Sequence, residues 1–220
     1  MRGYFGRMDL DHLIDGLIRY ISLVILLTFH EWGHAWMAWK CGDDTARNMG
    51  RCSINPLVHV DPLGTFLIPM IQVFFPAMGA ILIGWAKPVP VNPNNLRNPK
   101  LDDILISMAG PWMNLLLAVG LFGLAKAGLL LGVMPLAKFC VMSAILSLGL
   151  CFFNLIPIPP LDGSHVVRVL IGMSNETFYQ FARYGFIILI LILNLTPIPG
   201  WVGAAVMGAA SIMQGWFGLM

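Results

Sequence analysis

Residues 20–39 read Tyr-Ile-Ser-Leu-Val-Ile-Leu-Leu-Thr-Phe-His-Glu-Trp-Gly-His-Ala-Trp-Met-Ala-Trp, an apolar run that contains His30, Glu31 and His34. Its length and composition predict a membrane-spanning helix. Histidines four residues apart lie on one helix face, about 6 Å apart along the axis, so both imidazoles can bind one zinc ion. Glu31 would lie beside the metal and could take a proton from zinc-bound water. The alternative is that both histidines only hydrogen-bond neighbouring helices and that Glu31 is a buried ion-pair partner.

The composition independently predicts an all-α polytopic membrane protein. Hydrophobic residues make up 58% of the 220 residues and charged residues 11%, whereas soluble domains have about 25% charged residues. The length suffices for about five or six membrane segments in a single domain, residues 1–220, without a substantial soluble module. A net charge of +2 and the lack of a glycine-rich phosphate loop argue against nucleic acid, so the lipid bilayer is the expected partner.

The apolar runs are punctuated by proline-rich segments. The apolar runs cover about residues 20–39, 63–85, 103–125, 136–156, 178–195 and 201–220. Between the second and third runs, prolines forbid a helix in the segment Lys87 to Val91, which is predicted to be an extended strand or a loop. We expect the core of the domain to span residues 20–168 and the C-terminal membrane segments to span residues 178–220.

The fourth run ends in Asn-Leu-Ile-Pro-Ile-Pro-Pro-Leu-Asp-Gly, residues 154–163. Its prolines break the helix, and Gly163 permits an unusual backbone conformation beside Asp162. An Asp-Gly pair usually marks an ordinary turn. Together with the two histidines, however, Asp162 is the leading candidate for a third zinc ligand, which would leave the fourth position open for water, as a catalytic site requires.

Sharing one zinc ion constrains the topology. His34 and Asp162 both lie toward the C-terminal ends of their runs, so the first and fourth runs must point the same way. A complete crossing by Leu63 to Trp85 would make them antiparallel, so we expect a re-entrant hairpin bent near Pro69 or Pro76. Most lysines and arginines then fall on the side of the zinc site, which the positive-inside rule predicts to be cytoplasmic.

Three blocks of the sequence resemble the site-2 protease family of intramembrane zinc metalloproteases. They are Phe29 to His34, Ala109-Gly110-Pro111 with Asn114, and Asn154 to Gly163, in the same order and at similarly wide spacing, over roughly residues 22–168. The chain looks like the compact members of that family, which carry no PDZ or nucleotide-sensing domain. It differs from the simplest family core in having the additional apolar run Leu63 to Trp85.

The resemblance implies a catalytic machinery. By it, His30, His34 and Asp162 look like the ligands of one Zn²⁺ per chain, Glu31 like the general base, and Asn154 like the asparagine that helps to hold the substrate strand. The implied activity is hydrolysis of peptide bonds in membrane-spanning substrates, and we expect an integral protein of a prokaryotic plasma membrane. Alternatives are a divalent-metal transporter, which should carry several intramembrane acids or histidines at successive depths, and an inactive metal-binding scaffold, against which the intact Glu31 argues.

Other polar residues keep more than one interpretation. Asn114 could serve interhelical packing or substrate contact. Val89 lies in the segment Lys87 to Val91, which could hold an unwound substrate as an added β-strand or be a passive loop. His59 and Asp61 could line the site or belong to a polar surface loop. His165 follows Asp162 too closely to be a co-ligand and is more consistent with a surface role.

Overall fold

The structure is a computed structural model that describes residues 10–74 and 84–219, and every regular element in these ranges is helical. This confirms the all-α class. The α-helices are α1 (Leu10–Cys41), α2 (Thr45–Asn48), α3 (Ile68–Phe74), α4 (Pro99–Leu130), α5 (Met134–Asn154), α6 (Asp162–Leu170), α7 (Asn175–Leu195) and α8 (Ile198–Phe217). The 3-10 helices η1 (Pro56–Val58) and η4 (Pro93–Asn95) and the π-helix η2 (Pro62–Leu67) complete the described elements.

Four of these helices are long and apolar enough to cross a membrane. They are Leu13–Cys41 within α1, Pro99–Leu130, Met134–Asn154 and Asn175–Leu195. Helix α8 has 20 residues but is not among them. The chain is therefore an integral membrane protein, as the composition predicts. The first run begins earlier than residue 20, since α1 extends back to Leu10.

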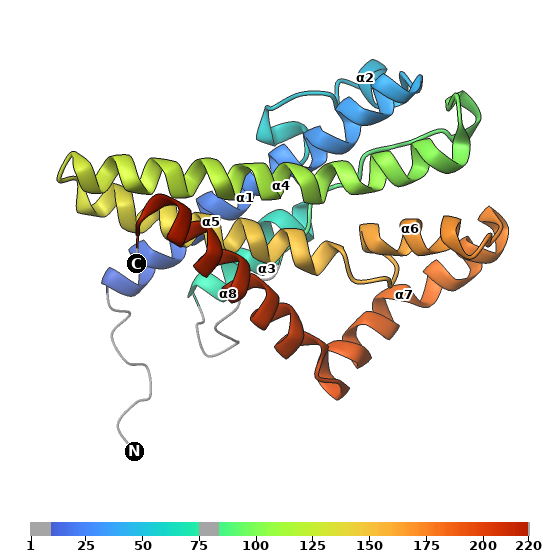
Figure 1. Cartoon of the computed structure of the whole chain (residues 1–220). Coiled ribbons are helices and arrows are strands. Elements are labelled where there is room, and N and C mark those ends of the chain that lie inside the picture. The colour runs from blue at the N-terminus through green and yellow to red at the C-terminus, as the bar shows by residue number, and fades with distance from the viewer. Residues whose placement is uncertain (1–9, 75–83, 220) are drawn as a thin grey trace.

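Helices α4 and α5 form an antiparallel pair at the centre of the fold (Figure 1). They are joined by a tight turn at Gly132, whose φ of 72° favours glycine. Helix α1 packs against both, and a hydrogen bond of 2.9 Å between the hydroxyls of Ser22 and Ser143 links α1 to α5. In Figure 1, α1 and α5 run in the same direction across the view and α4 runs in the opposite direction. The first and fourth runs are thus parallel, as a shared metal site requires.

The largest core cluster lies between α4, α5 and α8. It consists of small and large apolar side chains that interlock at this three-helix contact: Ala118, Phe122, Ala144, Leu148, Val206, Ala210 and Met213. The cluster secures the end of the α4–α5 pair that is remote from α2 (Figure 1).

The two ends of the apolar run 63–85 meet. The backbone N–H of Trp85 donates to the carbonyl of Gly64 at 3.1 Å, and the hydroxyl of Thr65 donates to the carbonyl of Trp85 at 2.7 Å. The described ends of this run therefore lie side by side, as the expected hairpin requires, and residues 75–83 between them lie outside the described residues. Of the two positions expected for the bend, Pro69 is the second residue of α3, directly after the π-helix η2, and Pro76 lies outside the described residues.

Buried polar side chains hold the segment after the hairpin against the end of α1. Asp43 accepts the backbone N–H of Asn92 at 2.7 Å, and the guanidinium of Arg51 donates to the carbonyl of Lys87. The carbonyl of His59 accepts the N–H of Lys87 at 2.9 Å. Residues 84–92 therefore form neither helix nor strand but are held in place beside the C-terminal end of α1.

Candidate metal centre

Helix α1 presents both histidines on its buried face. His30 and His34 are 4% and 8% exposed, and their Nε2 atoms lie 3.1 Å apart. Glu31, at the next helical position after His30, is half-buried and makes no hydrogen bond to the described residues. The glutamate is thus adjacent to the paired imidazoles and free to interact with another molecule.

The proline-rich turn after α5 brings Asp162 to the same point. Its Oδ2 lies 3.2 Å from His30 Nε2 and its Oδ1 lies 3.4 Å from His34 Nε2. A Cβ on Gly163 would stand 2.2 Å from the carbonyl oxygen of Leu155. Only glycine allows the chain to fold back this closely, which explains why a glycine follows the aspartate.

The donor atoms have the spacing of zinc ligands. Zinc bonds of about 2.0–2.1 Å in tetrahedral geometry place neighbouring ligand atoms about 3.3 Å apart. The two Nε2 atoms lie 3.1 Å apart, and they lie 3.2 and 3.4 Å from the two different carboxylate oxygens of Asp162, which is close to that value. One ligand atom from each of the three residues lies within 4.8 Å of the other two. Two imidazoles and a carboxylate also match the donor types that zinc prefers in catalytic sites.

Helix α4 orients both imidazoles through their second ring nitrogens. His34 Nδ1 lies 2.7 Å from the carbonyl of Ile106, to which it can donate, and this leaves Nε2 with its lone pair toward the metal. His30 Nδ1 lies 3.0 Å from the side-chain amide of Asn114, a fully buried residue whose Oδ1 has no partner. Turning this amide by 180° lets Oδ1 accept the Nδ1–H of His30, so that both Nε2 atoms are free to bind a metal.

A glycine makes room for the site on α4. A Cβ on Gly110 would lie 2.3 Å from His34 Nε2 and 2.6 Å from His30 Nε2. On the facing helix, a Cβ on Gly33 would lie 2.9 Å from the carbonyl oxygen of Ala109. The two helices therefore approach through glycine on both sides, and the metal group lies directly against the α4 backbone.

The other predicted site residues lie around this group but not in it. Asn154 is half-buried and donates to the carbonyl of Leu150 at 2.9 Å. Val89 is half-buried in the segment 84–92. Asn114 faces His30, and its contact with substrate stays a prediction.

The loop residues His59 and Asp61 support the fold beside the site. His59 is 2% exposed, and its Nε2 donates to the carbonyl of Ser53 at 2.8 Å. Burial lowers the pKa of His59 below its ordinary value of 6.5. Asp61 accepts the N–H groups of Leu63 and Gly64 at the start of η2. Their interactions are those of loop and helix-cap residues.

Sequence reasoning missed the contributions of Ile106, Gly110 and Asp103 on α4. Ile106 acts through its backbone, so its side chain carries no signal. Gly110 falls in the Ala-Gly-Pro block, but nothing in the sequence indicates that its missing Cβ faces two imidazoles. Asp103, three positions before Ile106, pairs with α6, and His165, whose side chain is 37% exposed, is one of its partners.

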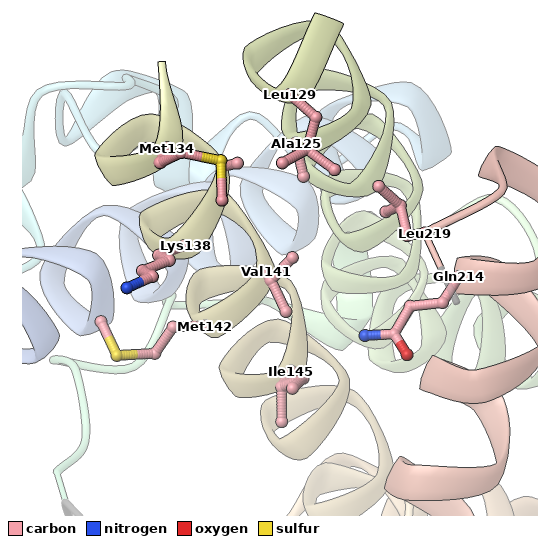
Figure 2. A pocket seen from close by; sticks show the side chains of 10 residues that line it. Ala125, Leu129, Met134, Lys138, Val141, Met142, Ile145, Gln214 and Leu219 are labelled. Atoms are coloured by element: carbon pink, nitrogen blue, oxygen red, sulfur yellow. The ribbon is translucent and has the colours of Figure 1, made fainter. Parts of the chain in front are cut away.

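The two described cavities lie away from the three donors. The larger, of about 440 Å³, lies between α4, α5 and the end of α8 and is lined mainly by apolar side chains with Lys138 and Gln214 (Figure 2). The second, of about 310 Å³, lies beside Asp103 and Arg168. Neither contains His30, His34 or Asp162 among its lining residues.

The comparisons with known proteins agree with this geometry. The chain is 38% identical over 190 residues to the Bacillus subtilis (strain 168) protein named "Putative zinc metalloprotease YwhC", covering 83% of this chain and 82% of that protein. It is 29% identical over 199 residues to the protein named "Putative zinc metalloprotease Rip2" from Mycolicibacterium smegmatis, covering 84% of this chain and 72% of that protein. No solved structure matches the chain significantly.

A helical membrane fold with this donor group is that of a membrane-embedded zinc metalloendopeptidase, and both relatives are named as zinc metalloproteases. The sequence model of Peptidase family M50 matches residues 19–136 and 128–195. The chain belongs to Peptidase family M50, the site-2 proteases, and its cofactor is zinc.

Proposed function

We propose that this protein cleaves peptide bonds of membrane-spanning substrates within the bilayer, with one zinc ion held by His30, His34 and Asp162. The observation that carries the proposal is the convergence of His30 Nε2, His34 Nε2 and the Asp162 carboxylate, with contacts of 3.1–3.4 Å, beside Glu31. Buried ionisable groups are costly in a membrane and are retained there for a function.

The residues of the chain divide the proposed chemistry among them. Zinc, when bound, lowers the pKa of water toward about 7 and polarises the peptide carbonyl. Glu31 takes the proton from the attacking water and later donates it to the nitrogen of the leaving amine. The carbonyl of Ile106 and the amide of Asn114 keep the imidazoles in the tautomer that exposes Nε2. Burial of the ligands excludes bulk water from the reacting bond.

Substrate binding is proposed to use the segment Lys87 to Val91 and Asn154. A transmembrane helix must unwind locally, because its amide bonds are shielded while it is helical. The N–H groups of Val89 and Val91 make no hydrogen bond to the described residues, so they are available to an added strand. The side chain of Asn154 uses its Nδ2 within α5, and its Oδ1 remains free to accept a substrate N–H.

The zinc site is proposed to lie nearer the cytoplasmic face of a prokaryotic plasma membrane. Basic residues gather in the loops and helix ends on the zinc side of the fold: Lys40, Arg47, Arg51, Lys87, Arg97, Lys100 and Arg168. Lys126 and Lys138 flank the α4–α5 turn at the opposite end. The positive-inside rule then assigns the first group to the cytoplasm. We further propose a single domain over residues 1–220, with its core at 20–168.

The test is a comparison of Glu31→Gln with two ligand variants on a single-span substrate in liposomes. We expect Glu31→Gln to lose cleavage and keep stoichiometric zinc, whereas His34→Ala and Asp162→Ala lose zinc as well. Glu176→Gln, the same chemical change at an exposed position of α7, is the matched control and should be fully active. Cleavage by Glu31→Gln at the wild-type rate would refute the proposed base, and zinc retained in Asp162→Ala would refute the ligand set.

A further inference from the structure

One face of α4 contacts both histidines of the metal centre and helix α6. Asp103, Ile106, Gly110 and Asn114 are spaced by three, four and four residues, so they lie in a row along the helix. Asn114 contacts His30, the carbonyl of Ile106 contacts His34, and Gly110 leaves space for both imidazoles. The remaining member of the row, Asp103, contacts helix α6, which begins with Asp162.

Local contacts place the start of α6 only in part: Leu161 is buried and its carbonyl accepts from the hydroxyl of Ser164 at 2.6 Å, but no hydrogen bond from these neighbours fixes the Asp162 carboxylate. Helix α6 has nine residues, and its N-cap Leu161 provides no side-chain hydrogen bond. The segment before it contains three prolines, Pro157, Pro159 and Pro160, which cannot donate backbone hydrogen bonds. A short helix on such a connection needs a contact from another element to place its first residue within a few tenths of an ångström.

Asp103 provides that contact with both carboxylate oxygens. Its Oδ2 accepts from Arg168 Nη2 at 2.7 Å, and its Oδ1 lies 3.4 Å from His165 Nδ1. The side chains of Asp103 and Arg168 are only 17% and 13% exposed, so the pair is shielded from solvent more than a surface ion pair. Phe178 of α7 packs on the other side, against the His165 ring at 4.7 Å and the Arg168 guanidinium at 5.5 Å.

We propose that Asp103 is a positioning residue of the metal centre, which acts through Arg168 and His165 on α6 and thereby sets the place of Asp162. This inference rests on the proposed function, because it takes Asp162 as a zinc ligand. Helix α4 then holds all three ligands, two by direct hydrogen bonds and the third through the tether between Asp103 and α6. Removal of the carboxylate leaves Arg168 largely buried without its partner, which favours displacement of α6.

The experiment measures zinc affinity by chelator competition on the full chain in detergent. We expect Asp103→Ala to weaken zinc binding by about 10- to 100-fold, the range found for partners that orient metal ligands. Asp103→Glu should recover part of the loss. With Co²⁺ in place of zinc, the visible spectrum of Asp103→Ala should differ from that of wild type, because the spectrum reports the ligand arrangement. Asp102→Ala is the matched control, because Asp102 is a buried carboxylate that accepts the N–H of Asn98, the N-cap residue of α4, instead of reaching α6.

A second background separates positioning from general loosening. In Asp162→Ala, the remaining zinc affinity should be unchanged, within about twofold, by adding Asp103→Ala. Asp103→Ala and Arg168→Ala together should also lose no more affinity than either alone. Wild-type zinc affinity and an unchanged Co²⁺ spectrum in Asp103→Ala would overturn the inference. It would also be overturned if Asp103→Ala weakened zinc binding as much in the Asp162→Ala background as it does in the wild-type background. Tight zinc binding by Asp162→Ala itself would instead refute the ligand assignment, so the two failures are distinguishable.

Discussion

Replacement of Gly110 by alanine tests whether the α4 backbone forms a wall of the metal site. The added Cβ would lie 2.3 Å from His34 Nε2, about 1.2 Å closer than an unstrained contact of about 3.5 Å. Zinc sites tolerate displacements of only about 0.2 Å in ligand distances. The imidazoles can rotate away in the absence of metal, so the clash penalises mainly the zinc-bound state.

The size of the effect follows from the cost of overpacking. An extra methyl group in a tightly packed site typically costs about 1–3 kcal/mol, which corresponds to roughly 5- to 150-fold in a binding constant. We therefore expect Gly110→Ala to bind zinc at least about 5-fold more weakly than wild type in a chelator-competition assay, with a corresponding loss of cleavage. The melting temperature of the metal-free protein should change little.

Gly120→Ala is the matched control on the same helix. A Cβ at Gly120 would have no atom within 4 Å, and alanine favours a helix over glycine by up to about 1 kcal/mol. This variant should bind zinc like wild type and should be at least as stable. Wild-type zinc affinity in Gly110→Ala would refute the close approach of α4 to the histidines, and equal losses in both variants would show a general sensitivity of the helix.

Three further predictions concern topology, substrate and pH. Single cysteines at the exposed positions Asp44 and Asn95, in a cysteine-free background, should react with an impermeant thiol reagent from the same face, and labelling from opposite faces would contradict the hairpin. Val89→Pro, which removes a backbone donor, should reduce cleavage of a helical membrane substrate much further than Val89→Thr at unchanged zinc content, whereas activity equal to wild type would make the segment a passive loop. Because burial lowers the pKa of His59, the unfolded chain takes up the proton first below pH 6.5, so stability should fall as the pH drops through that range. The melting temperature should therefore decline less between pH 7.5 and 5.5 in His59→Gln than in wild type, and identical declines would exclude this role.

Local sequence determined the membrane helices and two of the three donors. Apolar runs of about 20 residues have few stable forms in a bilayer other than a helix. Any α-helix places His30 and His34 on one face, whatever packs around it. The prediction of a re-entrant run also rests on sequence alone, because zinc sharing between residues far apart requires parallel helices. The exact ends of α1 could not be predicted from the sequence, since helix ends depend on caps and packing.

Tertiary structure decided which groups surround the metal. That Asp162 reaches the histidines depends on the fold-back at Gly163 and on α6, and neither is set by residues adjacent in sequence. The roles of Asn114, Ile106 and Gly110 arise because α4 crosses α1 through two glycines, so a backbone carbonyl and a missing Cβ become part of the site. Sequence periodicity predicts which residues share a helix face, but packing sets the distance between the faces of two helices. The contacts of a metal site depend on that distance.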